Sequence, residues 1–272
     1  MKTILVSGAS GIVGYGCLKS LRMGTKKYRL IGTTIHEDSI APAFCDVFEK
    51  APLTSDADYI KWLEFIIDKY CVDLIIPGIE ADLYKWCEQR QRISDKTNMV
   101  MNNPALVELC QDKWNFYQKL NASAPELTIP SRIEGSFEEF KNLYGLPFLI
   151  KPRRGFGSKG IVIIHNELEF INHQKLLQQC MAQPIVGSEN EEYTVSAFFS
   201  ASGELCCFMA LRRRLSKEGF TEFAQTTDVP GVRPSIQRLG EIFKPVGPTN
   251  FQFRVQDNAL FSTRCFEFKT TR

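Results

Sequence analysis

Amphipathic stretches alternate with short β-type runs over the first hundred residues of the chain. Strands are predicted at Ile4–Val6, Arg29–Thr34, Val72–Ile76 and Met99–Met101, the third being wholly apolar, as in a strand buried on both faces of a parallel sheet. Helices are predicted at Tyr15–Met23, Ala57–Tyr70 and Glu80–Arg92, where apolar residues recur at helical spacing. This β-α-β-α order predicts an α/β domain with a parallel sheet and right-handed crossovers.

The pattern changes after the turn signal Asn102-Asn103-Pro104, and we place the main domain boundary near Pro104. Two strands flank a basic, glycine-rich loop in "GLPFLIKPRRGFGSKGIVII", which predicts a hairpin rather than a βα unit. Further helices are predicted at Ala105–Leu120, Phe137–Tyr144 and Glu167–Gln179. Further strands are predicted at Met181–Val186, Glu192–Ser200, Glu204–Arg212, Phe251–Val255 and Cys265–Phe268.

Composition narrows the class of protein. The 272 residues are 44% hydrophobic and 24% charged, and the net charge of +2 is too small to favour a nucleic-acid or membrane-surface partner. No apolar run reaches the roughly 18 residues of a membrane span. The nine cysteines are scattered, and none of the three histidines lies at ligand spacing to one, so we expect reduced thiols, no zinc and a cytoplasmic location.

The opening stretch "ILVSGASGIVG" contains Gly8-x-x-Gly11-x-x-Gly14, a spacing found in dinucleotide-binding loops. An NAD(P)-dependent dehydrogenase or epimerase would need a catalytic Tyr-x-x-x-Lys well down the chain. The only match is Tyr15–Lys19, beside the glycine loop, and the acidic residues Glu37 and Asp38 come slightly late for ribose. This function is therefore the least favoured, and the loop is interpreted as the substrate-side edge of the domain.

The segment "FLIKPRRGFGSKG" has the chemistry of a phosphate lid. Its glycines let backbone N–H groups approach a ligand, and its lysines supply positive charge to phosphate oxygens. A solvated basic turn between two strands would have the same composition. The segment alone does not separate the two interpretations.

Five segments in register decide between them: "QDKWNFYQKL", "FLIKPRRGFGSKG", "AQPIVGSENEEYTVSAFF", "NFQFRV" and "CFEF". Together they resemble the ATP-grasp superfamily, most closely the carbamoyl-phosphate-synthase-like carboxylate–amine ligases. The resemblance implies a Rossmann-like pre-ATP-grasp domain over residues 1–104. It also implies an α+β ATP-grasp fold, with a small subdomain and phosphate lid over 105–186 and a C-terminal subdomain, cut short, over 187–272.

The resemblance assigns a set of nucleotide contacts. Lys113 and Lys151 would reach the phosphates, Lys151 also serving catalysis, and Gly157, Ser158 and Lys159 would close over them. Gln183, Pro184 and Ile185 would form the hinge that holds adenine through the backbone, although Pro184 lacks an N–H donor. Glu192 would accept from the ribose hydroxyls, with Glu191 as an adjacent competitor. A surface location is the alternative for Lys113 and for both acids.

Magnesium would be held by Gln252 and Glu267, which lie where the family places its metal ligands, and Glu267 would also be catalytic. Glu267 lies between Phe266 and Phe268, so its side chain faces away from theirs. After this glutamate the family reads x-Asn-Pro-Arg, whereas this chain reads Glu267-Phe268-Lys269-Thr270-Thr271-Arg272. The ammonium of Lys269 has no lone pair for a metal, so we expect catalysis to be impaired.

The resulting hypothesis is an ATP- and Mg-dependent ligase that joins a small-molecule carboxylate to an amine through an acyl phosphate. A non-catalytic ATP-binding protein or partner subunit is the alternative. One arginine of Arg212-Arg213-Arg214 could contact phosphate or substrate, or all three could be solvated, and "GFTEFAQTTD" is interpreted as a substrate-side loop. The substrates and the oligomeric state, a homodimer included, are left open.

Overall fold

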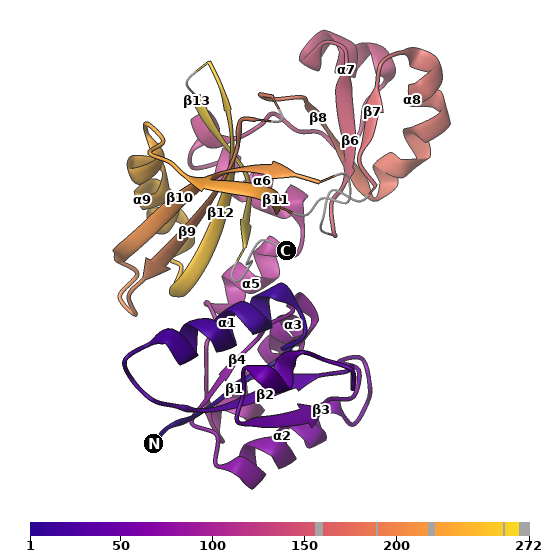
Figure 1. Ribbon diagram of the computed structural model, residues 1–272. Coiled ribbons are helices and arrows are strands. Elements are labelled where there is room, and N and C mark those ends of the chain that lie inside the picture. The colour runs from indigo at the N-terminus through magenta and orange to yellow at the C-terminus, as the bar shows by residue number, and fades with distance from the viewer. Residues whose placement is uncertain (156–159, 189, 217–220, 258, 267–272) are drawn as a thin grey trace. The chain divides into compact units, whose positions relative to one another are not determined.

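The protein is described by a computed structural model that covers residues 1–155, 160–188, 190–216, 221–257 and 259–266 (Figure 1). It divides into two compact units, the first comprising Met1–Asn102 and the second beginning at Asn103. The predicted boundary near Pro104 lies next to this division. No helix in the described ranges is long and apolar enough to cross a bilayer.

The first unit contains a five-stranded parallel sheet with the order β3-β2-β1-β4-β5, so the predicted parallel α/β architecture is confirmed. Its strands are β1 (Thr3–Val6), β2 (Arg29–Thr34), β3 (Val47–Lys50), β4 (Leu74–Ile76) and β5 (Asn98–Met99). Its helices are α1 (Ile12–Met23), α2 (Tyr59–Tyr70), α3 (Glu80–Glu88), α4 (Arg90–Ser94) and the 3₁₀ turn η1 (Ala41–Ala43). The sequence analysis missed β3, and the single helix predicted over Glu80–Arg92 is interrupted at Gln89.

Apolar side chains cover both faces of this sheet. Because successive residues of a strand point to opposite faces, Leu5 joins the cluster with α2, whereas Ile4 and Val6 join the cluster with α1. Each cluster draws its members only from the first unit. A sheet covered in this way explains why the β4 segment is wholly apolar.

The glycine loop after β1 has a packing role. A Cβ atom on Gly14 would lie 2.5 Å from the carbonyl oxygen of Gly8, and one on Gly78 would lie 2.0 Å from that of Ser7. Gly8 itself has φ +57°, in the left-handed region that glycine tolerates. The loop glycines are therefore explained by close backbone approach between β1, α1 and the segment after β4.

The second unit begins with helices α5 (Pro104–Cys110) and α6 (Lys113–Asn121) and the turn η2 (Pro125–Leu127). A small antiparallel sheet, ordered β7-β6-β8, follows with β6 (Phe148–Pro152), β7 (Val162–Ile164) and β8 (Cys180–Pro184). Its buried aromatic cluster includes residues of α7 (Phe137–Tyr144) and α8 (Glu167–His173), and the turn η3 (Gln174–Gln178) continues from α8. The predicted hairpin is confirmed.

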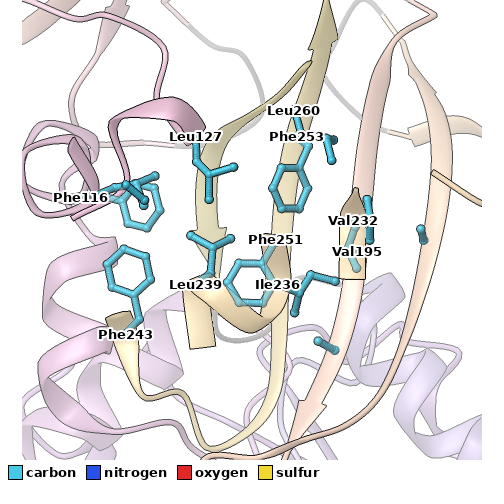
Figure 2. Close-up of a cluster of buried hydrophobic side chains, with 14 of the residues drawn as sticks. Phe116, Leu127, Val195, Val232, Ile236, Leu239, Phe243, Phe251, Phe253 and Leu260 are labelled. Carbon is cyan, nitrogen blue, oxygen red and sulfur yellow. The ribbon is translucent and has the colours of Figure 1, made fainter. Parts of the chain in front are cut away.

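A five-stranded antiparallel sheet, ordered β11-β10-β9-β12-β13, completes the unit (Figure 1). It comprises β9 (Glu192–Phe199), β10 (Leu205–Leu215), β11 (Thr221–Thr226), β12 (Gly247–Gln256) and β13 (Ala259–Phe266). One face packs against α9 (Val232–Phe243), α5 and α6, and Figure 2 shows this core. Phe116 of α6 stacks on Phe243 of α9 with the ring centroids 5.0 Å apart.

Three sequence expectations for this unit are wrong. The helix predicted over Ala105–Leu120 is two helices, because the Asp112 side chain accepts from the N–H of Trp114 at 2.9 Å and starts a new one. The helix predicted over Glu167–Gln179 is α-helical only to His173. Within "GFTEFAQTTD", Thr221–Thr226 forms the edge strand β11 rather than a loop, and α9 was not predicted.

Candidate functional site

A narrow cleft in the second unit is formed by side chains from α6, the loop after η2, β6, β8 and β13. Three of the sequence-predicted site residues line it together: Lys113, Lys151 and Gln183. The remaining lining residues are Phe116, Tyr117, Leu120, Thr128, Ile129, Met181, Ser262 and Thr263. The cleft thus brings two cationic side chains, buried apolar side chains and several hydroxyl groups together around a space of about 10 Å³.

Lys113 is bonded to the start of the glycine-rich loop. Its Nζ donates to the carbonyl oxygens of Pro152 at 2.9 Å and Gly155 at 3.0 Å, and its backbone N–H donates to Arg153 at 2.9 Å. These contacts differ from those of a solvated helix lysine. They fix the backbone of the loop that directly follows β6, the strand that contains Lys151.

Asp112 ties the same loop to α6 through an ion pair. Its carboxylate, 5% exposed, accepts from Arg153 Nη2 at 2.8 Å and Nε at 3.2 Å. Burial would raise the pKa of Asp112, but hydrogen bonds from Arg153 and the Trp114 N–H, together with the charge of Arg153, hold that pKa below its ordinary value. Asp112 was missed by sequence reasoning, although an aspartate directly before a helical segment is an N-cap signal.

The predicted hinge is only partly in the cleft. Gln183 is 5% exposed, and its Nε2 donates to Ser131 Oγ at 2.6 Å. Pro184 ends β8 opposite Phe148, and Ile185 is 40% exposed; neither lines the cleft. The adenine contact at these residues therefore stays a prediction.

Glu192 is held between two arginines. The register aligns it with Arg213 of β10 on one side and Arg254 of β12 on the other. Arg213 Nη2 donates to Oε1, and Arg254 Nη2 donates to Oε2 at 2.6 Å. Glu192 and Arg213 are both more than nine-tenths buried. Glu192 is therefore part of a buried network of charged side chains and not a surface acid.

Alternation along β10 separates the three consecutive arginines. Arg213 joins the buried network, whereas Arg212 and Arg214 are exposed and bond to Gln225 and Glu222 of β11. The alternation of side chains along a strand predicts that Arg213 lies on the opposite face from Arg212 and Arg214. The sequence does not indicate which of the two faces is buried. The neighbouring acid, Glu191, accepts from the N–H of Ser188 at 2.8 Å, and this bond lowers its pKa.

The predicted magnesium site is only half described. The Gln252 amide lies against Arg213, and with its oxygen facing the guanidinium it accepts from Nη2 at 2.7 Å. Glu267 and Lys269 lie outside the described residues, as do the lid residues Gly157, Ser158 and Lys159. Within the described ranges, no three His, Cys, Asp or Glu side chains are grouped for a metal.

Ser262 is a further residue of the cleft that the sequence did not indicate. It is 6% exposed, and its Oγ has no hydrogen-bond partner within the part of the chain that the structure describes. A buried hydroxyl without a partner is uncommon in folded proteins. Its position in the cleft marks a point where a ligand could supply the missing hydrogen bond.

Comparison with known proteins identifies the fold. Residues 110–224 match the ATP-grasp domain family. N5-carboxyaminoimidazole synthetase from Staphylococcus aureus, solved with ADP, has a TM-score of 0.76 at 18% identity over 99% of this chain and 71% of that one. No curated protein matches the chain by sequence.

Biotin carboxylases show the same likeness. The enzyme from Campylobacter jejuni has a TM-score of 0.74 at 14% identity over 99% of this chain and 66% of that one. The biotin carboxylase domain of the Hydrogenobacter thermophilus 2-oxoglutarate carboxylase has a TM-score of 0.75 at 12% identity, over 99% and 64%. The closer resemblance to the carbamoyl-phosphate-synthase-like ligases and the roles of the individual residues stay predictions. The ATP-grasp resemblance itself is confirmed: residues 110–224 match the ATP-grasp domain family, the chain has the fold of these neighbours, and a parallel α/β unit precedes the matched segment in the sequence.

Proposed function

We propose that this protein binds ATP in the cleft of its second unit and joins a carboxylate to an amine. The observation that carries the proposal is the convergence of Lys113 and Lys151 in one cleft, beside the backbone of a glycine-rich loop. Lysine ammonium groups and loop N–H groups are suited to phosphate oxygens. The structural neighbours solved with ADP or an ATP analogue have the same fold.

The residues of the cleft would have different roles in nucleotide binding. Lys151 would contact phosphate from β6, and Lys113 would keep the loop backbone in place through its bonds to Pro152 and Gly155. Ser262 Oγ would donate to or accept from the nucleotide and so gain its missing partner.

The chemistry follows from the proposed substrates. A carboxylate oxygen would attack the γ-phosphorus of ATP, which releases ADP and forms an acyl phosphate. The amine nitrogen would then attack the acyl carbon, form the C–N bond, lose a proton and expel phosphate. The protein would contribute positioning, positive charge and exclusion of water, and no side-chain nucleophile is required.

Magnesium would neutralise charge on the phosphate oxygens when bound. Gln252 and Glu267 are the proposed ligands. The described residues do not by themselves form a metal site.

Thermal unfolding of the full chain with ADP, ATP·Mg²⁺ or NADPH tests nucleotide binding. A ligand that binds only the native state raises the melting temperature. At a ligand concentration of a hundred times the Kd, the free energy of unfolding increases by about 2.7 kcal/mol. We expect ADP and ATP·Mg²⁺ to raise it and NADPH to leave it unchanged. Lys151→Met should weaken ADP binding about tenfold or more, because it removes a charge-assisted hydrogen bond.

Lys141→Met is the matched control, since Lys141 is an exposed residue of α7 that forms an ion pair with Glu138 at 3.1 Å and does not line the cleft. It should bind ADP like the wild type. A melting temperature that responds to NADPH but not to ADP would overturn the proposal.

One observation favours a non-catalytic ATP-binding protein instead. Gln252, a proposed metal ligand, faces the Arg213 guanidinium, and a positive charge disfavours a cation at that position. Release of phosphate from ATP in the presence of pooled carboxylates and amines separates the two functions. Binding without release supports the non-catalytic protein, and substrate-dependent release supports the ligase.

A further inference from the structure

A pocket of about 650 Å³ lies within the first unit, lined only by residues between Gly8 and Asp82. Its walls come from the carboxyl ends of the parallel strands: Gly8 and Ser10 follow β1, Thr33 and Thr34 end β2, and Ile79 follows β4. The strand order reverses between β1 and β4, and open parallel sheets bind ligands at such a reversal. The volume is in the range of small-molecule sites.

The charged side chains that line this pocket are acidic. Its sixteen lining residues include the carboxylates of Asp38 and Asp82, one histidine, His36, and neither a lysine nor an arginine. Lys50, at the end of β3, is engaged elsewhere in an ion pair with Glu37 at 2.6 Å. The lining therefore does not provide the positive side chains that a phosphorylated ligand would require.

Asp82 is the most deeply placed of these groups, with 3% of its surface exposed. Its Oδ1 accepts from the hydroxyl groups of Thr54 at 2.6 Å and Tyr59 at 2.7 Å. Trp86 Nε1 donates to the Tyr59 oxygen at 3.1 Å, which leaves the phenol proton for Asp82. Burial and the nearby Asp82 charge raise the pKa of Tyr59 far above its ordinary value, so the phenol remains a donor.

The second oxygen of Asp82 is differently placed. No residue in the described ranges donates to Oδ2, and no cation lies within ion-pair distance of the carboxylate. A buried carboxylate without a counter-ion is costly, because its charge loses hydration without gaining a partner. The neighbouring hydroxyls of Ser10, Thr33 and Thr34 offer acceptor oxygens around the same pocket.

We propose that this pocket binds a small molecule through a primary ammonium group, with Asp82 Oδ2 as its anchor and Asp38 as a second negative charge. An ammonium has three donors and no acceptor, which matches a pocket lined by a carboxylate and several hydroxyl oxygens. A neutral polyol could make the hydrogen bonds but would leave the charge of Asp82 uncompensated. This pocket is lined by residues of the first unit, whereas the proposed nucleotide cleft is lined by residues of the second, and the proposal does not rest on nucleotide binding.

Isothermal titration of the full chain at low ionic strength tests the site with two probes of equal length, 1,5-diaminopentane and 1,5-pentanediol. We expect the diamine to bind and the diol not to bind. Asp82→Asn retains an oxygen for Thr54 and Tyr59 but removes the charge, and it should weaken diamine binding about tenfold or more. Asp38→Asn, at an exposed position, should weaken it about two- to fivefold.

Glu80→Gln is the matched control, because it removes the same charge from the first turn of α3 at a residue that does not line the pocket. It should bind the diamine like the wild type. Equal binding of diol and diamine, no diamine binding by the wild type, or full binding by Asp82→Asn would each overturn the proposal. ADP titrations of the same variants should be unchanged, so a failure of the nucleotide proposal is seen separately.

Discussion

At the scale of single residues, the second unit depends on buried acids whose partners come from distant parts of the chain. Asp112 caps α6 and holds Arg153, forty-one residues further on, beside the glycine-rich loop. A carboxylate in such a position stabilises the fold through its charge, its cap and its link to the loop. These three contributions can be separated by pH and by substitution.

Asp112→Asn should lower the melting temperature at pH 7 by an amount equivalent to about 2–3 kcal/mol, because the partly buried Arg153 loses the buried carboxylate that it pairs with. The pKa of Asp112 is lower in the folded than in the unfolded protein, so its stabilisation is present above the unfolded pKa of about 3.9 and is lost as the pH falls through the folded pKa. The melting temperatures of wild type and variant should therefore differ constantly above about pH 5 and converge in more acidic solution.

Glu138→Gln provides the comparison, since this exposed acid forms an ion pair with Lys141 three residues later on α7. Its melting temperature should follow that of the wild type within the effect of about 0.5 kcal/mol typical of surface pairs. A gap between wild type and Asp112→Asn that stays constant down to pH 2 would contradict the assigned role of the Asp112 charge.

Glu192 offers a second residue-scale prediction. Glu192→Gln should destabilise the protein by about 3–5 kcal/mol, because two guanidinium groups would then face a neutral amide in a buried position. Chemical denaturation of the purified variant measures the loss.

The edge strand β11 of the same sheet supplies the control. Arg214 and Glu222 form an ion pair in which both side chains are more than half exposed, so Glu222→Gln should change stability by about 0.5 kcal/mol or less. Equal effects of the two substitutions would mean that the Glu192 network is not a buried one.

At the scale of elements, two glycines of α1 allow the packing explanation of the opening loop to be tested. Gly14→Ala places a Cβ against the backbone of Gly8 and Ser7, which cannot move aside like a side chain, so it should destabilise by about 1–3 kcal/mol. Gly16→Ala, in the same helix, meets nothing within 4 Å and should stabilise by about 0.5–1 kcal/mol. Urea denaturation of both variants gives the two signs, and a loss of stability in both would show that helix propensity was misjudged.

Much of the element order could be predicted from the sequence, and the failures have physical causes. The strands β1 and β2, helix α7 and the β6–β7 hairpin agree with the elements predicted from the sequence. Helix α9 was missed although Val232, Ile236, Leu239 and Phe243 lie at helical spacing, because Pro230 and Gly231 precede it as turn signals. The break before α6 was missed because one side-chain cap at Asp112 overrides a continuous apolar pattern.

The candidate site was predictable only in part. Lys113, Lys151 and Gln183 were placed by motif and do meet in one cleft. The partners of Glu192 were not predictable, because Arg213 and Arg254 become its neighbours only through the register of three antiparallel strands. Ser262 and Asp82 likewise acquire their significance from burial, which a single sequence does not show.

At the scale of the whole molecule, the two units have separate hydrophobic cores. The two clusters that cover the parallel sheet contain only residues up to Met101, and the two clusters of the second unit contain only residues from Leu106 onward. Domains of about 100 residues with a complete core commonly fold alone. A fragment ending at Asn102 should therefore fold independently, with cooperative thermal unfolding and circular dichroism typical of mixed α/β structure.

Two further variants make this prediction specific. A fragment ending at Thr97 lacks β5, which pairs with β4 through Leu74 and Ile75, and it should unfold at a lower temperature than the fragment ending at Asn102. Gly14→Ala should destabilise the longer fragment as much as it destabilises the full chain, because the contacted atoms all belong to the first unit. If the fragment ending at Asn102 unfolds without a cooperative transition, the first unit needs the second in order to fold. The inference that the two cores are independent would then be wrong.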